Sequence, residues 1–376
     1  MSDTDKHRFF FHPGSYEYDF GHHHPLRPER LRRTLDLLGA VRVTDGMRVE
    51  EPKLVHTDEL LRCHSHEYVV AVERASDGHV AELEFGLRAT DNPAFPGMFE
   101  AALAYTSASV SAAYAVVNGA EVAFNITGGL HHAMRSRAAG FCIFNDCAIA
   151  CSILRDRFAR VAYVDIDLHH GDGVQFLFYD DPTVLTFSIH QDGRSLFPGT
   201  GHVSEIGEGP GAGSSVNVPL PPGTTDRLWL EAFEPALRRS FELFEPEAVV
   251  LQMGTDPHYL DPLGQLSMTA QGWLEAVRIV SSYGLPLVGL GGGGYNLSTV
   301  PRMWTAAVAH LSGTTIPEQI PLDLAAKIGA DHFFDLERPP GEEAMTQQLQ
   351  PIVDDIRRSV AVGPLAALES LVLSRG

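Results

Sequence analysis

Short apolar runs that alternate with helical segments are the feature that most restricts how this chain can fold. Six runs rich in β-branched, aliphatic or aromatic residues, bounded by turn-forming residues, predict strands at 9–11, 122–126, 161–166, 184–189, 248–253 and 286–290. Strands that are apolar along their whole length are buried on both faces, as in parallel sheets covered by helices. The alternation therefore predicts an α/β fold, with one open, mostly parallel sheet and helices on both faces.

Four segments between these runs have the residue spacing of helices. We expect helices over 28–38, ending at Gly39, over the Ala-rich segment 98–117, from an N-cap at Asp226, and from Thr269 to Tyr283, closed by Gly284. Residues 313–376 are amphipathic in patches, with a breaker at 339–341. We predict a single domain over residues 1–376, with catalytic loops within about 10–310 and a C-terminal helical appendage at about 313–376.

Polar residues gather where the predicted strands end. Five strands lead into such clusters, at 128–132, 165–173, 190–192, 254–258 and 291–295. Ligands of open α/β sheets bind beyond the carboxyl ends of the strands. The sequence therefore predicts a functional site at this edge of the sheet.

The segment DIDLHHGDG at 165–173 carries the strongest signal. In an extended backbone Asp165, Asp167 and His169 would lie on one face. Carboxylates directly after an apolar strand are costly unless a cation or partner compensates them. Asp and His side chains suit Zn²⁺ or Fe²⁺, and Asp256 from another strand end would complete a three-ligand site with open positions. A salt-bridged loop without metal is the alternative, disfavoured by the scarcity of nearby Lys and Arg.

Two further features predict catalytic groups. The adjacent His131 and His132 suit a pair of proton-transfer groups, each oriented by its own carboxylate. Structural histidines are the alternative, which the glycines at 128–129 disfavour because they permit close approach to a ligand. The glycine run 291–294 lacks the residues of a phosphate-binding loop, so we expect it to deliver Tyr295, whose phenol could donate to an oxyanion. A core tyrosine is the alternative there.

Composition excludes several classes of protein. The chain has 376 residues, 44% hydrophobic and 20% charged, which is typical of a globular fold. A net charge of −20 disfavours nucleic acid and anionic membranes as partners and would attract a cationic substrate, such as a basic peptide or a polyamine. Four cysteines without a CxxC pair, and no long apolar segment, favour a reducing, cytoplasmic location. The oligomeric state is left open.

Eight segments occur together in the order typical of one family. They are HPLRPERL (24–31), DNPAFPGM (91–98), GGLHHA (128–133), GFCIFND (140–146), VDIDLHHGDGV (164–174), FPGTG (197–201), GTDPHYLDPLG (254–264) and GGGGYN (291–296). In this combination the chain resembles the classical zinc-dependent histone deacetylases of the arginase/deacetylase superfamily. Among these it is most similar to bacterial acetoin-utilisation-type and histone-deacetylase-like proteins.

The resemblance implies a role for each matching residue. The implied metal ligands are Asp167, His169 and Asp256. The implied catalytic groups are the pairs His131–Asp165 and His132–Asp172, together with Tyr295. The implied substrate-binding residues are Asp91, Gly140, Phe141, Phe197 and Leu263, and the implied K⁺ or Na⁺ site uses Asp165, Asp167, His169, Ser188 and Ile189. Leu263 stands where polyamine-deacetylating relatives carry Glu, and Leu196 where many relatives carry a second aromatic residue.

The function implied is hydrolysis of acetyl or short acyl groups from lysine side chains by water activated on Zn²⁺, with Fe²⁺ as the other candidate metal. The substrate would be an acetylated protein or peptide. Three alternatives stay open: a deacetylase of acetylpolyamines or other small acetylated amines, an arginase-like hydrolase with two Mn²⁺ ions, and a non-catalytic acyl-lysine binding protein.

Overall fold

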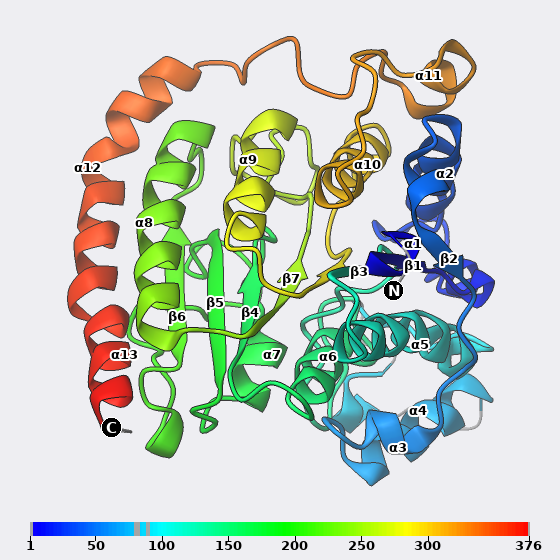
Figure 1. Ribbon diagram of the computed structural model, residues 1–376, viewed down its shortest axis with the longest axis horizontal. Coiled ribbons are helices and arrows are strands. Elements are labelled where there is room, and N and C mark those ends of the chain that lie inside the picture. The colour runs from blue at the N-terminus through cyan, green and yellow to red at the C-terminus, as the bar shows by residue number, and fades with distance from the viewer. Residues whose placement is uncertain (1–2, 79–82, 88–90, 375–376) are drawn as a thin grey trace.

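One eight-stranded sheet runs through the centre of the computed structural model, which describes residues 3–78, 83–87 and 91–374 (Figure 1). The strand order is β2-β1-β3-β8-β7-β4-β5-β6, and neighbouring strands pair in parallel. The strands are β1 (His7–Phe10), β2 (Arg48–Glu50), β3 (Val122–Asn125), β4 (Val161–Asp165), β5 (Val184–Gln191), β6 (Ser215–Leu220), β7 (Ala248–Gln252) and β8 (Leu287–Leu290). The predicted open parallel sheet is confirmed.

All six predicted strands are present, but two edge strands were missed. β2 is three residues long and largely exposed, so its sequence carries no burial signal. β6 contains Asn217 and Pro219, and proline in a strand argues against a central position. An edge strand tolerates proline because one side of its backbone needs no partner, and β6 lies at the end of the sheet.

Helices cover both faces because the central strands are apolar on both sides. In β4, Ala162 and Val164 belong to one hydrophobic cluster, whereas Val161 and Tyr163 belong to the other. The first cluster includes residues of α2 (Glu29–Ala40), α8 (Asp226–Phe244), α9 (Ala270–Ser281), α10 (Thr299–Leu311), α12 (Glu342–Val362) and α13 (Pro364–Leu373). The second includes residues of α3 (Thr57–Leu60), α4 (His66–Ser76), α5 (Met98–Val117), α6 (Asp146–Leu154) and α7 (Asp172–Leu177).

Three predicted helix ends were wrong. α2 continues past Gly39 to Ala40, and Arg42 takes the left-handed conformation instead. The N-cap position of α8 is Thr225, and Asp226 is the first residue of the helix. The Asp226 carboxylate does not cap the helix but accepts hydrogen bonds from the amide and hydroxyl of Thr269. Thr269 caps α9 as predicted, but the helix ends at Ser281, before Tyr283.

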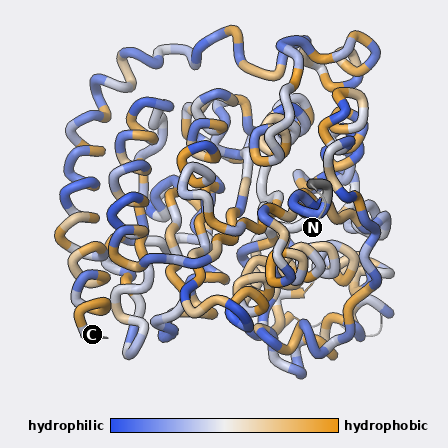
Figure 2. The backbone as a smooth tube through the Cα atoms, viewed as in Figure 1, coloured by the Kyte–Doolittle hydropathy of each residue, from blue (hydrophilic) through white to orange (hydrophobic). Residues whose placement is uncertain are grey.

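The C-terminal segment folds back over the sheet. After α11 (Leu322–Ile328), α12 and α13 run alongside α8, and both also contact β6 (Figure 1). Hydrophilic and hydrophobic stretches alternate along α12 (Figure 2), as expected for a helix with one packed face. Within the described part of the chain, no helix has the length and apolarity to cross a membrane.

Candidate active site

The carboxyl ends of β4, β7 and β8 bring the candidate site together. β4 ends at Asp165, so Asp167 and His169 lie in the irregular segment that follows it. The expectation that these three side chains share one strand face was therefore wrong. The Asp165 carboxylate faces His131, whereas Asp167 and His169 face Asp256, which follows β7.

Asp167, His169 and Asp256 form a buried cluster of potential metal ligands. One donor atom from each lies within 4.8 Å of the other two, and within the described residues no second group of three His, Cys, Asp or Glu has this geometry. The Nδ1 atom of His169 is 3.2 Å from Asp167 Oδ1 and 3.1 Å from Asp256 Oδ2. Two ligands of a tetrahedral zinc ion lie about 3.3 Å apart, so the donor set fits such an ion.

The electrostatics of the cluster show a shortage of positive charge. Burial lowers the pKa of His169, but the hydrogen bonds and charges of Asp167 and Asp256 outweigh burial and raise it to about 10. Burial and the charge of Asp167 raise the pKa of Asp256 to about 7. In the described part of the chain no Lys or Arg forms an ion pair with either carboxylate, so a bound cation is the natural counter-charge.

Backbone and side-chain donors fix the orientation of these carboxylates. Asp167 Oδ2 accepts hydrogen bonds from Gln252 Nε2 at 2.7 Å and from the amide of Gly293 at 2.8 Å. Asp256 Oδ1 accepts from the amide of Leu168 at 3.1 Å. Such outer contacts hold metal ligands in position. Gln252 was missed by the sequence reasoning, although a polar residue that ends an apolar strand was the available signal.

His131 and His132 each contact their own carboxylate, as the resemblance implied. His131 Nδ1 is 2.8 Å from Asp165 Oδ2, and His132 Nδ1 is 2.7 Å from Asp172 Oδ1. The Nε2 atoms of the two rings lie 3.0 Å apart. Burial lowers the pKa of His131, but Asp165 and Asp167 outweigh it and raise the pKa to about 9. Burial and the charge of His131 lower the pKa of His132, so His132 is the neutral ring of the pair.

A buried carboxylate that the sequence reasoning missed anchors the histidine loop. Asp146, at the start of α6, accepts hydrogen bonds from the amides of Gly129 at 2.9 Å and Leu130 at 2.8 Å. Gly129 has a positive φ of 89°, and a Cβ atom there would lie 2.4 Å from the backbone nitrogen of Gly292. The close approach of these two loops thus requires glycine at this position.

Tyr295 lines a small cavity together with His131, His132 and Asp167. Its backbone amide donates to Asp261 Oδ2 at 2.7 Å, which ties the glycine-rich loop to the loop that carries Asp256. Burial raises the pKa of the Tyr295 phenol well above its usual value, so the hydroxyl stays protonated and able to donate. Cys142 also lines the cavity, but burial raises the pKa of its thiol well above its usual value, which argues against a nucleophile.

Aromatic rings surround this group of residues. The Phe141 ring packs at 5.7 Å from the Tyr295 ring, and the Phe197 ring at 5.0 Å from the His132 ring. The amide of Gly140 donates to Asp91 Oδ2 at 3.1 Å, so Asp91, Gly140 and Phe141 form one unit. His24, not predicted here, packs on Phe141 at 4.4 Å and contacts the Asp91 carbonyl.

The predicted residues not yet placed are Leu263, Ser188 and Ile189, and none of them lines the cavity. Leu263 is half-buried on the loop that follows Asp256, with its amide bound to Asp261. Ser188 on β5 pairs with Asp165 on β4, and Ile189 follows it in the same strand. The predicted monovalent-cation residues are therefore neighbours in sequence or in the sheet.

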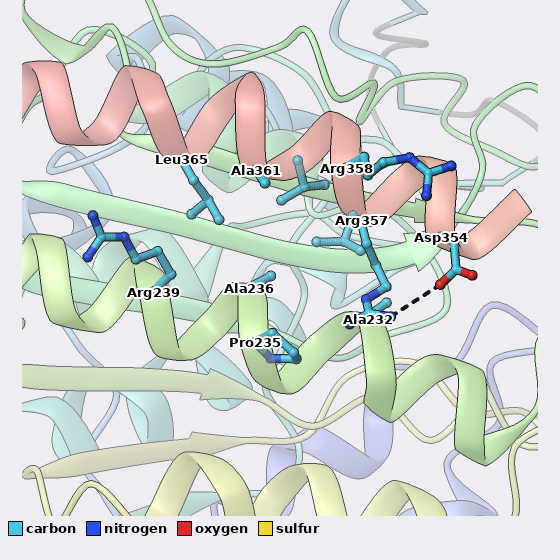
Figure 3. Close-up of a pocket in the computed structure, with 11 residues that line it drawn as sticks. Ala232, Pro235, Ala236, Arg239, Asp354, Arg357, Arg358, Ala361 and Leu365 are labelled. Carbon is cyan, nitrogen blue, oxygen red and sulfur yellow. Dashed lines mark hydrogen bonds and ion pairs between the residues drawn. The ribbon is translucent and has the colours of Figure 1, made fainter. Parts of the chain in front are cut away.

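A larger surface groove lies elsewhere, and its charged side chains are paired as on an ordinary protein surface. It has a volume of about 490 Å³ and lies between α8 and α12, and small residues of α8, such as Ala232 and Ala236, line it (Figure 3). Its three arginines, Arg239, Arg357 and Arg358, all form ion pairs with nearby carboxylates. No histidine, cysteine or metal-ligand group lines it, so the strand-end cluster is the candidate active site.

Comparison with known proteins agrees with this geometry. A histone deacetylase domain model matches residues 24–311. The acetoin utilization protein AcuC of Bacillus subtilis (strain 168) is 40% identical over 330 residues, which cover 85% of each chain. Histone deacetylase clr6 of Schizosaccharomyces pombe is 35% identical over 356 residues, covering 93% of this chain and 87% of that protein.

A solved structure gives the same result for the fold. The crystal structure of an HDAC homolog complexed with SAHA superposes with a TM-score of 0.87 at 30% sequence identity, covering 94% of this chain and 99% of the other. The eight-stranded parallel sheet, the converging strand-end residues and these similarities together show that the chain belongs to the histone deacetylase family.

Proposed function

We propose that this protein is a zinc-dependent deacetylase that hydrolyses the amide bond of acetylated or short-acylated lysine side chains. Membership of the histone deacetylase family gives the reaction class, hydrolysis of an acylated amine. The observation that carries the finer proposal is the buried Asp167–His169–Asp256 cluster, whose donor spacing suits one tetrahedral ion beside a neutral histidine. Fe²⁺ fits the same donors and is the second candidate metal.

The proposed metal ligands are Asp167, His169 and Asp256, with Gln252 and Gly293 orienting Asp167. When bound, the ion would polarise the acyl carbonyl and lower the pKa of a water molecule, from ~16 toward ~7 in favourable zinc sites. We also propose that K⁺ or Na⁺ binds near Asp165, Asp167, His169, Ser188 and Ile189.

A separate proposal concerns the domain organisation: residues 1–376 would form one deacetylase domain.

The remaining chemistry belongs to the two histidines and the tyrosine. His132, neutral and oriented by Asp172, would accept the proton of the attacking water at Nε2 and later donate it to the leaving amine. His131, paired with Asp165, would place a positive field beside the developing charge. The protonated hydroxyl of Tyr295 would donate to the oxyanion of the tetrahedral intermediate.

The surroundings favour an acyl-lysine substrate. Phe141 and Phe197 would flank the aliphatic part of the lysine side chain, and Asp91 would contact the backbone of the substrate. Leu263 is apolar, whereas the resemblance implies a Glu at this position in relatives that deacetylate polyamines. The excess of acidic residues, 48 against 28 basic ones, would attract basic peptides.

The test is acetate release by zinc-loaded protein from acetyl-lysine peptides and acetylpolyamines, assayed side by side for the wild type and Tyr295→Phe. We expect peptide turnover by the wild type and a loss of about 10²–10³-fold in kcat for Tyr295→Phe, because one donor to the oxyanion is removed. Zinc content should not change, since the phenol is not among the proposed ligands. Tyr283→Phe, a half-buried tyrosine beside Phe241, is the matched control. Full turnover by Tyr295→Phe would refute the proposed role.

A further inference from the structure

A carboxylate from the C-terminal segment is inserted into the part of the molecule that carries the active-site loops. Asp335 follows α11 in the chain and lies beyond residues 24–311, the part matched by the deacetylase domain model. Its side chain is only 5% exposed. Its carboxylate accepts hydrogen bonds from Arg302 at 2.6 Å, from the amide of Ala270 at 2.7 Å and from His258 at 2.9 Å.

His258 connects Asp335 to the loop around Asp256. Its Nε2 atom faces Asp335, and its Nδ1 atom accepts a hydrogen bond from the amide of Leu260 at 3.1 Å. Both bonds require a proton on Nε2 and a free lone pair on Nδ1. The carboxylate of Asp335 favours this tautomer, because it can only accept. A substitution of Asp335 would therefore weaken the hydrogen bond that the Leu260 amide donates to His258.

Loop 256–263 holds two elements of the candidate site. It begins with the proposed metal ligand Asp256, and it contains Asp261, which accepts the amide hydrogen of Tyr295 at 2.7 Å. The backbone amide of Asp261 in turn donates a hydrogen bond to the His258 carbonyl at 2.8 Å. In addition, the carbonyl of Leu260 accepts from the side chain of Asn296, next to Tyr295. A continuous series of hydrogen bonds thus connects Asp335 with Tyr295.

We propose that Asp335 is a positioning residue: through His258 it fixes loop 256–263, and thereby the placement of Asp256 and Tyr295. Asp335 then supports the candidate site from the C-terminal segment, whereas α12 and α13 of that segment pack against α8. The inference rests on the proposed zinc-dependent function for its effect on catalysis. Its effect on the loop does not depend on that function. Residues that act through metal ligands typically alter metal affinity or activity by about 10–100-fold.

The experiment compares Asp335→Asn, His258→Gln and Leu368→Ala in the full-length protein. Hydrogen exchange of the Leu260, Leu263 and Tyr295 amides is measured without metal. Zinc affinity, kcat and KM are then measured with an acetyl-lysine peptide. We expect at least about 10-fold faster exchange at these amides in Asp335→Asn and His258→Gln, about 10-fold weaker zinc binding, and kcat lowered by about 10–100-fold with KM changed less.

Leu368→Ala is the matched control, because this fully buried residue of α13 belongs to the same C-terminal segment but has no contact with the hydrogen-bond series. It should lower stability while leaving the three amides, zinc affinity and kcat within about two-fold of the wild type. If Asp335→Asn does not fold, the inference is tested with His258→Gln alone, because this variant keeps the Arg302–Asp335 ion pair. Unchanged amide exchange in a folded variant would overturn the inference. Failure of wild-type protein to bind zinc or release acetate would instead refute the proposed function.

Discussion

The candidate active site and the groove between α8 and α12 both contain charged side chains, but these differ in burial and in their ion-pair partners. Asp167 and Asp256 are buried and, within the described residues, have no Lys or Arg as an ion-pair partner. In the groove, Arg239, Arg357 and Arg358 are 44%, 39% and 68% exposed, and all have carboxylate partners. Histidines are the only ion-pair partners of Asp167 and Asp256 within the described residues, and buried charge that is incompletely compensated is costly, so it persists where a ligand or a reaction requires it. The difference favours the strand-end cluster over the groove as the candidate active site.

The largest effect should follow from removing a proposed metal ligand. Asp256→Ala takes away one of three donors, so we expect zinc affinity to fall by more than the roughly 10–100-fold typical of outer contacts, with no measurable deacetylation. Zinc titration and acetate release provide the measurement. The corresponding change in the groove, Asp354→Ala, should alter neither quantity. Normal zinc content in Asp256→Ala would contradict the ligand assignment.

The next largest effect should come from the neutral histidine. His132→Ala removes the proposed proton acceptor, and general acid–base groups contribute about 10²–10⁴-fold. Because His132 is not one of the clustered donors, zinc affinity should change much less than kcat. Steady-state kinetics on zinc-loaded protein would measure this separation. A loss of zinc in proportion to the loss of turnover would argue for a structural role.

The third prediction concerns the acid stability of the buried Asp335 network. Burial raises the pKa of Asp335, but the hydrogen bond from His258 and the charge of Arg302 outweigh burial, so the pKa lies well below its usual value. A depressed carboxyl pKa stabilises the fold above the unfolded pKa, near 3.9, and this stability is lost as the pH falls through the folded pKa. Asp335→Asn should therefore cost about 3–5 kcal/mol at pH 7, since it breaks a buried ion pair.

The measurement is the free energy of unfolding in urea as a function of pH. The gap between the wild type and Asp335→Asn should be constant near neutral pH and shrink below about pH 4. A gap that stays constant down to pH 3 would show that the Asp335 charge does not provide the stability.

The smallest effect should be seen in the groove itself. Arg357→Ala removes an exposed ion pair with Asp354, and such pairs contribute about 0–1 kcal/mol. Stability should change by no more than this amount, and deacetylation should be unaffected. Thermal unfolding and an acetate-release assay would measure both quantities. A large loss of activity would mean that the groove takes part in function after all.

Much of the fold could be predicted because its signals are local. Six apolar runs became strands, since residues buried on both faces of a sheet must be apolar along their whole length. β6 was missed because an edge strand can contain Asn217 and Pro219, which are read as turn formers. The end of α2 was misplaced because Arg42, and not Gly39, takes the left-handed turn.

The candidate site could be predicted where its residues stand close together in the sequence. The DIDLHHGDG segment and the His131–His132 pair carry their chemistry in the residue types themselves. Gln252, Asp146 and Asp261 gave no comparable signal, because each acts on a backbone amide or carboxylate that a different loop supplies.

The sequence alone determined the alternation of strands and helices, the polar strand ends and the chemical types available for a metal and for proton transfer. These follow from the period of apolar residues and from the identity of the side chains, which need no knowledge of neighbours in space. Only the tertiary structure decided that Asp165 contacts His131 while His169 contacts both Asp167 and Asp256, and that Asp335 reaches His258 from 77 residues away. The physical reason is that sheet order and loop packing, not residue type, bring distant carboxylates within hydrogen-bonding distance of a buried partner.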